Sequence, residues 1–138
     1  MTRVYVDMVA DLFHYGHANF LKKARQFGDY LIVGIHSDKV VKEYKRSPIM
    51  TMKERVDTVS SCRHVDEVIP DAPFIVDQEW ITAHRIDLVV HGDDFSGEMK
   101  QLCYKIPIDL GIFRLVPYTS DISTTDIIKR IETHIRNC

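Results

Sequence analysis

The feature that most constrains the fold of this chain is an apolar run, Tyr30-Leu31-Ile32-Val33-Gly34-Ile35, bounded by polar residues. Such a short run is typical of a strand buried on both faces, as the strands of a parallel sheet are. Residues 3–7 are also rich in strand-forming types, and residues 17–27 place apolar side chains at helical spacing, with Gly28 in the position of a C-cap. The sequence therefore predicts a strand–helix–strand unit at the start of the chain.

The same alternation continues over the rest of the chain. Further strands are predicted at 65–69, 87–91 and 112–116, and helices at 37–44, 51–62, 78–84, 97–110 and from 123 onward, with a loop at 70–77. Pro107 is expected to break or kink the tail of the segment 97–110. This alternation predicts one α/β domain over residues 1–138, with a parallel sheet covered by helices on both faces. In such a sheet the ligand site lies beyond the carboxyl ends of the strands.

Composition and charge exclude several classes of function. The formal net charge is −2, so non-specific binding of nucleic acid or of an anionic membrane has no electrostatic support. The three cysteines, Cys62, Cys103 and Cys138, lack metal-binding spacing and favour reduced thiols, which predicts a cytoplasmic location. There is no signal-peptide pattern and no apolar run of roughly 20 residues, so we expect no membrane anchor.

The strongest chemical signal is the stretch His14-Tyr15-Gly16-His17, where the first predicted strand leads into the first predicted helix. Such a junction attracts anions, because the first helical amides are unpaired and the helix dipole is positive there. Two imidazoles add donors that can be charged near neutral pH. Two alternatives stay open: the histidines are incidental, or they supply two of the three or four ligands of a zinc site. We favour the handling of a phosphate group.

Three other stretches also include strand ends or helix starts, which favours a single site: 45–55, 92–94 and 118–125. Ser123-Thr124-Thr125 has the pattern of a helix N-cap, and its extra hydroxyls would suit a second part of a polyphosphate. Gly92-Asp93-Asp94 is either a simple turn or a contact with a nucleotide base, a ribose or a divalent metal. Lys45 and Arg46 are either a solvated charge run or the cations that an anionic substrate needs. There is no Walker loop, no Gly-x-Gly-x-x-Gly run and no nucleophile elbow, so P-loop hydrolysis, dinucleotide binding and Ser-His-Asp catalysis are not indicated.

With these motifs in this order, the chain resembles the small cytidylyltransferases of the nucleotidyltransferase superfamily. These include the glycerol-3-phosphate, ethanolamine-phosphate and choline-phosphate cytidylyltransferases. The resemblance covers nearly the whole chain and rests on Lys45 and on the segments 11–17, 28–34, 54–55, 63–69, 91–94 and 122–126. It implies a single Rossmann-like α/β domain with a five-stranded parallel sheet in the order 3-2-1-4-5. It also implies a homodimer formed through the segment Arg63–Ile69.

The resemblance further implies a reaction in which CTP and a small phosphorylated molecule give a CDP-linked product and pyrophosphate. Such a step needs positioning and charge stabilisation rather than a covalent intermediate. His14 and His17 would donate to the α- and β-phosphates as charge builds on the bridging oxygen. Lys45 would bind the acceptor phosphate and the α-phosphate. Arg55, by default a surface residue in the middle of a helix, would support the triphosphate.

The resemblance also implies a set of nucleotide contacts: Val9, Ala10, Asp11, His14, Gly16, His17, Gly92, Asp94, Tyr118, Ser123, Thr124 and Thr125. Within this set, Ser123 to Thr125 would hold the β,γ end of the triphosphate, and Asp94 with the backbone around Gly92 would contact the cytidine. Mg²⁺ or another divalent cation would neutralise the polyphosphate. It would be held mainly by phosphate oxygens, with Asp11 as the metal ligand from the protein.

The chain departs from the family pattern at two places and from the related adenylyltransferases at a third. The segment Met8-Val9-Ala10 stands where the family commonly has Gly-Thr-Phe or Gly-Ala-Phe. Tyr118-Thr119-Ser120-Asp121 stands where the family signature begins Arg-Thr-x-Gly, so a triphosphate-binding arginine is missing. Related adenylyltransferases carry an arginine at the position of Ile128, which favours CTP over ATP.

The sequence thus predicts a cytidylyltransferase acting on a phosphorylated alcohol of the phosphoethanolamine, phosphocholine or glycerol-3-phosphate type, or on a phosphonate. The alternatives are an adenylyltransferase of the same fold and a non-catalytic nucleotide-binding regulatory module, which the missing arginine keeps open. The acceptor pocket is expected near 8–10, 36, 45 and 74–80. Phe74, Trp80 and Tyr118 are candidates for an aromatic box around a quaternary amine.

Overall fold

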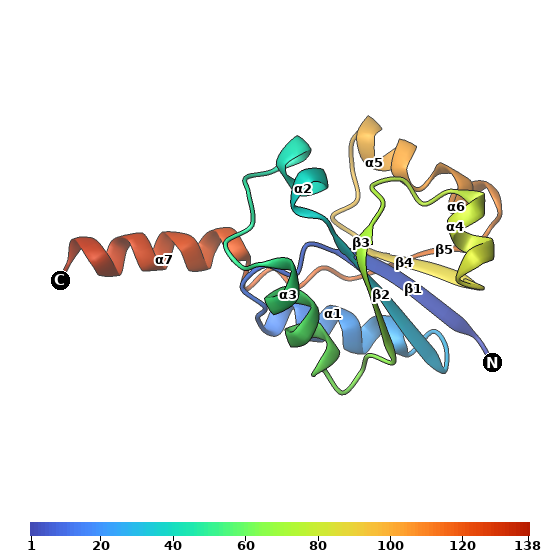
Figure 1. Ribbon diagram of the computed structural model, residues 1–138, viewed down its shortest axis with the longest axis horizontal. Coiled ribbons are helices and arrows are strands. Elements are labelled where there is room, and N and C mark those ends of the chain that lie inside the picture. The colour runs from blue at the N-terminus through green and yellow to red at the C-terminus, as the bar shows by residue number, and fades with distance from the viewer.

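A five-stranded parallel sheet surrounded by helices forms the body of the computed structural model, which describes residues 1–138 (Figure 1). The strands are β1 (Arg3–Met8), β2 (Tyr30–His36), β3 (Glu67–Ala72), β4 (Leu88–Gly92) and β5 (Phe113–Val116). All neighbouring pairs are parallel, and their order across the sheet is β3-β2-β1-β4-β5. The predicted α/β class and strand order are confirmed.

The helices cover both faces of the sheet. They are α1 (Tyr15–Arg25), α2 (Asp38–Tyr44), α3 (Met52–Ser60), α4 (Gln78–Ala83), α5 (Glu98–Cys103), α6 (Lys105–Asp109) and α7 (Thr124–Arg136). Successive side chains of a strand point to opposite faces. Val4 of β1 therefore packs with Leu21 of α1 and Val59 of α3, whereas Tyr5 packs with Ile81 of α4. This alternation produces two apolar cores, one on each side of the sheet.

Two element boundaries differ from the prediction because of their tertiary surroundings. β3 continues through Pro70 to Ala72, where a loop was expected from Pro70 onward. β3 pairs only with β2 and forms an edge of the sheet, where a proline without an N–H is tolerated. The expected helix 97–110 is two short helices that meet at Tyr104, not at Pro107. Tyr104 has a non-helical backbone (φ −114°, ψ 14°), and its buried side chain reaches β1.

Gly28 is not the C-cap of α1, so that prediction is wrong. The helix ends at Arg25, and Gln26 in the αR conformation caps it. A Cβ on Gly28 would lie 2.5 Å from the carbonyl oxygen of Thr2. Glycine is needed here because the chain passes close to the start of β1, not because a helix ends in a left-handed turn.

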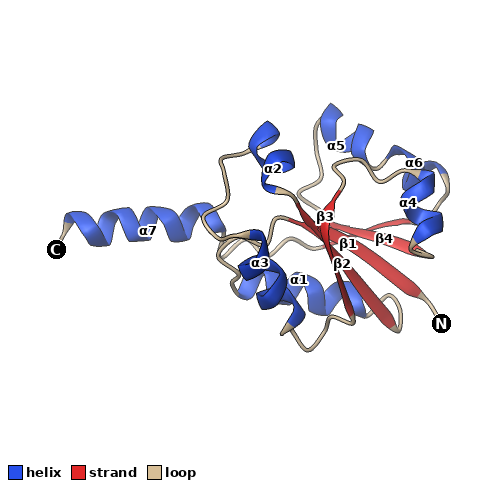
Figure 2. Ribbon diagram, viewed as in Figure 1, coloured by secondary structure: helices blue, strands red, loops and turns tan.

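α7 projects away from the sheet, with no buried residue along its length (Figure 2). Only its first turn lies against the body, through a hydrogen bond from the Thr124 hydroxyl to the carbonyl of Asp11 (2.9 Å). Ile131 and Ile135 on its apolar side are 47% and 66% exposed. None of the helices combines the length and the apolar character that spanning a membrane requires.

Candidate functional site

The two histidines of the first turn are held by the N-terminus of α1. Strand order reverses at β1, and the loop from β1 to α1 therefore lies at the switch point of the sheet, where such folds bind ligands. The Nδ1 atom of His14 accepts from the amide of Gly16 (3.0 Å), and Nδ1 of His17 accepts from the amide of His14 (3.1 Å). Because Nδ1 accepts in both rings, the neutral tautomer carries its proton on Nε2. The ring centroids lie 4.0 Å apart, so the site presents two neighbouring Nε2–H donors.

Gly16 is required for this arrangement. A Cβ on Gly16 would lie 2.7 Å from Cε1 of His14 and 3.4 Å from Cγ2 of Ile122. Any side chain at this position would push the His14 ring out of its cap. The glycine of the His-x-Gly-His pattern thus keeps the first imidazole close to the helix N-terminus.

The environment of the histidines favours their neutral form. Burial lowers the pKa of His17 to about 4, with the nearby positive charges of His14 and Lys45 acting in the same direction against Asp11. Burial also lowers the pKa of His14, and Arg130 of α7 adds to the shift. The expectation of imidazoles charged near neutral pH is therefore replaced by a pair of neutral donors.

We expect this shift to appear in the stability of the protein. A histidine whose pKa is lower in the folded state binds fewer protons when folded, so its stabilising contribution is complete above about pH 6.5 and is lost as the pH falls towards 4. His17→Asn, which retains an acceptor for the His14 amide, removes this contribution. Between pH 7 and pH 4.5 wild type should lose about 2 kcal/mol more unfolding free energy than the variant, measured by urea denaturation. Parallel losses in the two proteins would contradict the assignment.

Asp11 ties three segments together beneath the histidines. Its two carboxylate oxygens accept from the amides of Ile49 and Met50, both at 2.9 Å, and its side chain is almost fully buried. Its backbone carbonyl accepts the Thr124 hydroxyl. The flanking residues Ala10 and Leu12 have left-handed backbones (φ 60° and 50°), a strained conformation for residues with a Cβ. Asp11 thus positions the loop, and both of the oxygens predicted to ligate a metal are already engaged.

Arg55 lies inside the protein and not on the surface. Its side chain is fully buried, and Nη1 donates to the carbonyls of Val9 (2.8 Å) and His36 (2.9 Å). Its other terminal nitrogen pairs with the carboxylate of Asp38. The guanidinium therefore holds together the backbone just after β1 and the last residue of β2.

The N-terminus of α7 supplies free backbone donors. The Ser123 hydroxyl caps the helix by accepting from the amide of Asp126 (3.1 Å), and the Thr124 hydroxyl is engaged with Asp11. Thr125 is exposed. The amides of Thr124 and Thr125 have no partner within the chain. These two amides, more than the first two hydroxyls, are available to an anion.

A third group of predicted residues follows β4 and α2. A Cβ on Gly92 would lie 2.8 Å from Oδ1 of Asp94, so the carboxylate folds back over the glycine. Nζ of Lys100 lies 3.9 Å from Oδ2 of Asp94. Burial lowers the pKa of Lys45, Lys100 adds to this, and Asp94 opposes it. Tyr118 is 50% exposed, and its amide donates to the carboxylate of Asp93 (2.8 Å).

A buried polar cluster on the other face of the sheet was missed by sequence reasoning. Asp7 of β1 is almost fully buried, and Oδ1 accepts from the hydroxyl of Tyr104. Its Oδ2 lies 3.4 Å from Nε2 of His36, whose Nδ1 lies 2.8 Å from the hydroxyl of Tyr44. Burial works against the charged form of Asp7, but His36 and Tyr104 outweigh it and hold the pKa of the carboxyl below its usual value. The signal in the sequence was a carboxylate within a strand predicted to be buried.

Aromatic rings enclose this cluster. The Tyr44 and Phe74 ring centroids are 5.0 Å apart, and Phe74 lies 6.4 Å from the His36 ring. Of the three rings predicted to form an aromatic box, Phe74 belongs to this wall. Trp80 instead packs against Tyr5 and His84. Tyr44 is 37% exposed, so the cluster reaches the surface through this ring.

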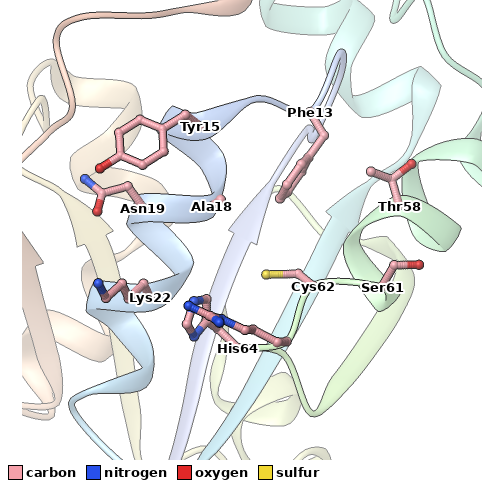
Figure 3. Close-up of a pocket in the computed structure, with 10 residues that line it drawn as sticks. Phe13, Tyr15, Ala18, Asn19, Lys22, Thr58, Ser61, Cys62 and His64 are labelled. Carbon is pink, nitrogen blue, oxygen red and sulfur yellow. The ribbon is translucent and has the colours of Figure 1, made fainter.

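A separate groove of about 480 Å³ lies between α1 and the C-terminal end of α3 (Figure 3). Its lining combines apolar, polar and basic side chains: Phe13, Tyr15, Ala18, Asn19, Lys22, Thr58, Ser61, Cys62, Arg63 and His64. Tyr15 is 65% exposed at its edge. The groove borders the histidine turn but contains neither His14 nor His17.

Comparison with known proteins identifies the family. The sequence profile described as Cytidylyltransferase-like matches residues 8–130. The chain belongs to the cytidylyltransferase-like family. It is 50% identical over 133 residues to ethanolamine-phosphate cytidylyltransferase of Dictyostelium discoideum, covering 93% of this chain and 37% of that protein. It is 43% identical over 132 residues to choline-phosphate cytidylyltransferase A of Mus musculus, covering 94% and 36%.

The cytidylyltransferase-like chain also has a solved structural relative. The lipopolysaccharide core biosynthesis protein from Thermoplasma volcanium GSS1 superposes with a TM-score of 0.72 at 25% identity, covering 87% of this chain and 99% of that one. The two curated relatives are much longer, and this chain spans about a third of their length. The predicted family is confirmed.

In this cytidylyltransferase-like fold the histidine turn, Asp11 and the start of α7 meet at the switch point of the sheet. The contact from Thr124 to Asp11 joins two of these segments directly. Lys45 lies close enough to lower the pKa of His17. Arg55 and the Asp11 carboxylate lie beneath these groups and hold the loops that carry them.

Proposed function

We propose that this chain transfers CMP from CTP to a small phosphorylated alcohol and releases pyrophosphate. The observation that carries the proposal is the pair of free Nε2–H donors on His14 and His17, tied through Asp11 to the unpaired amides of α7. Two neighbouring groups of donors, one at the start of α1 and one at the start of α7, suit a polyphosphate better than a single phosphate. The names of the two curated relatives agree with this chemistry.

The bond changes in such a transfer balance without a covalent enzyme intermediate. An oxygen of the acceptor phosphate attacks the α-phosphorus of CTP, and the bond from that phosphorus to the α,β-bridging oxygen breaks. The electron pair of the broken bond stays on pyrophosphate, so negative charge grows on the leaving group. His14 and His17 donate hydrogen bonds to this charge as neutral imidazoles, and the α7 amides hold the β,γ end.

Lys45 and Asp94 occupy the acceptor and nucleoside sides of the proposed site. The Lys45 ammonium near the histidines would bring two anions, the acceptor phosphate and the α-phosphate, into contact despite their repulsion. Asp94 and the backbone of Gly92 would contact the cytidine. Arg55 would act indirectly, by holding the carbonyl of Val9 beside the nucleotide.

A divalent cation has little support from the protein. No group of three His, Cys, Asp or Glu side chains could hold a metal ion, and the Asp11 carboxylate is occupied by two amides. A cation accompanying CTP would depend on the oxygens of the phosphates themselves.

The acceptor is proposed to carry a cationic amine. Asp7 is a buried carboxylate whose Oδ2 makes no hydrogen bond and has only the His36 ring as a charged neighbour, at 3.4 Å, so it would accept from the ammonium group of a ligand. The Tyr44 and Phe74 rings beside it suit a cation by cation–π attraction. A phosphoethanolamine or phosphocholine headgroup meets both conditions, whereas glycerol-3-phosphate and a simple phosphonate offer no cation.

We also propose a homodimer through Arg63–Ile69. Arg63 and His64 line the groove beside α1, next to the exposed ring of Tyr15, and this surface is large enough to receive a neighbouring side chain. The three cysteines form no disulfide, so they agree with a reducing, cytoplasmic setting for such an assembly. Light scattering of the purified chain tests the dimer: a monomer at every concentration would refute it.

Pyrophosphate release tests the proposed function. The chain is incubated with CTP or ATP and with phosphoethanolamine, phosphocholine, glycerol-3-phosphate or a small phosphonate. We expect release with CTP and an amine-bearing acceptor. Release with ATP but not with CTP would favour the adenylyltransferase alternative. Binding of CTP without release from any acceptor would favour a regulatory nucleotide-binding module.

A further inference from the structure

We infer that Arg130 of α7 binds the terminal phosphate of CTP, because it is an unpaired cation on the same side of α7 as the residue that caps the start of that helix. The inference rests on the proposed function, since it concerns the triphosphate end of the nucleotide in that reaction. It assigns a full positive charge to the part of the site from which pyrophosphate leaves.

The donors assigned so far to the triphosphate carry little positive charge. His14 and His17 are held in their neutral form, and the free amides of α7 offer only the partial charge of a helix start. Arg55 is fully buried and already paired with Asp38. Lys45 is proposed to hold the acceptor phosphate and the α-phosphate. The β,γ end of a highly charged anion therefore still lacks a cation from the protein.

Helix geometry directs Arg130 towards that end of the nucleotide. It follows the cap residue Ser123 by seven residues, almost two turns of 3.6 residues, so the two lie on one side of α7. Side chains of a helix incline towards its N-terminus, and the long arginine side chain therefore extends towards the free amides. This side of the helix is entirely polar, and one groove along it is lined by Asp126, Lys129, Arg130, Thr133, His134 and Asn137.

The first turn of α7 is fixed against the histidine turn, which places Arg130 relative to the leaving group. The Thr124 hydroxyl donates to the carbonyl of Asp11 (2.9 Å), and Cγ2 of Ile122 lies 3.4 Å from the position of a Cβ on Gly16. The charge of Arg130 is also near enough to His14 to help lower the pKa of that imidazole. Arg130 thus lies on the side of α7 from which it can reach the phosphates that His14 contacts.

A solvated surface charge is the competing explanation, since Arg130 is exposed. Asp126 precedes it by four residues, a spacing at which opposite charges often pair along a helix, yet Arg130 belongs to no ion pair of the protein. Its neighbour Lys129 is also exposed and unpaired, but of these two cations it is Arg130 whose charge acts on His14. A merely solvated Arg130 would affect nucleotide binding no more than Lys129 does, so Lys129 provides the matched control.

Calorimetric titration with CTP and with CDP, in the absence of any acceptor, tests the inference. Arg130→Met removes the charge but suits a helix, and should weaken the binding of CTP about tenfold or more, because hydrogen bonds between a guanidinium and a phosphate are charge-assisted. The binding of CDP, which has no γ-phosphate, should change much less. Arg130→Lys keeps the charge without the planar fork and should lose less affinity for CTP than Arg130→Met. Lys129→Met should bind both nucleotides as wild type does.

Product inhibition provides a second measurement on the same variants. Inhibition by pyrophosphate should weaken in Arg130→Met by a factor similar to the loss in CTP affinity, whereas inhibition by the CDP-linked product should stay at the wild-type level. Wild-type affinity for CTP in Arg130→Met, an equal loss in Lys129→Met, or an equal loss for CTP and CDP would overturn the inference and leave the proposed function intact. Absence of turnover with every acceptor would instead refute the proposed function, and the titrations, which need no acceptor, would still decide the role of Arg130.

Discussion

Replacing His17 with alanine is expected to lower kcat for pyrophosphate release from CTP by about 10²- to 10³-fold or more. This is the range observed when one preorganised donor to a developing negative charge is removed. His17 presents a free Nε2–H, and burial holds its pKa near 4, so the donor is neutral and fixed throughout the physiological range. The loss should appear in kcat more than in the KM for CTP, because the hydrogen bond strengthens as the leaving group becomes charged.

The control for this prediction is His134→Ala, at an exposed position near the end of α7. It removes an imidazole that lies far from the turn and should leave kcat at the wild-type level. Unfolding curves of His17→Ala at pH 7 verify that the variant is folded. A rate close to that of wild type in a folded His17→Ala protein would refute the role proposed for this donor.

Replacing Arg55 with methionine is expected to reduce the free energy of unfolding by about 3 kcal/mol or more. The guanidinium is fully buried and donates to the carbonyls of Val9 and His36, which the substitution leaves without a partner. Each unsatisfied buried carbonyl costs roughly 1–3 kcal/mol. The lost pair with Asp38 adds little, since that carboxylate is 54% exposed. Urea denaturation at pH 7 measures the loss.

Lys53→Met is the matched control on the same helix. Its ammonium is 85% exposed and pairs with Asp57 on the surface, so its removal should produce no measurable change in the denaturation midpoint. Arg55→Lys separates charge from geometry, because one ammonium cannot serve two carbonyls and a carboxylate as the planar guanidinium does. If Arg55→Met were as stable as wild type but inactive, Arg55 would act on the substrate directly.

The order of elements could be predicted from local patterns in the sequence. The apolar run Tyr30–Ile35 and its neighbours alternate with helical spacing, and that alternation leads to a parallel sheet. The predicted element boundaries were wrong where tertiary contacts determine the backbone conformation. Pro70 continues a strand because β3 is at an edge, and the helix after Gly97 breaks at Tyr104, whose hydroxyl binds Asp7.

The position of His14 and His17 at a strand–helix junction could also be predicted, because spacing along the chain is local. By contrast, the free state of both Nε2 atoms depends on which amides the Nδ1 atoms accept from, and the pKa of His17 depends on its burial. The position of Arg55 in the middle of a helix suggested a surface residue, but the guanidinium is buried and donates to the carbonyls of Val9 and His36.

The sequence alone determined the family, the sheet and the placement of His14 and His17 at a helix start, because these depend on neighbours along the chain. Only the tertiary structure brought Asp7 and His36 face to face. They lie on adjacent parallel strands whose connection runs through α1, and their contact depends on the register between β1 and β2. A pattern of burial along one strand contains no information about register with the next. The contact between these two buried side chains therefore depends on a pairing that no local pattern could predict.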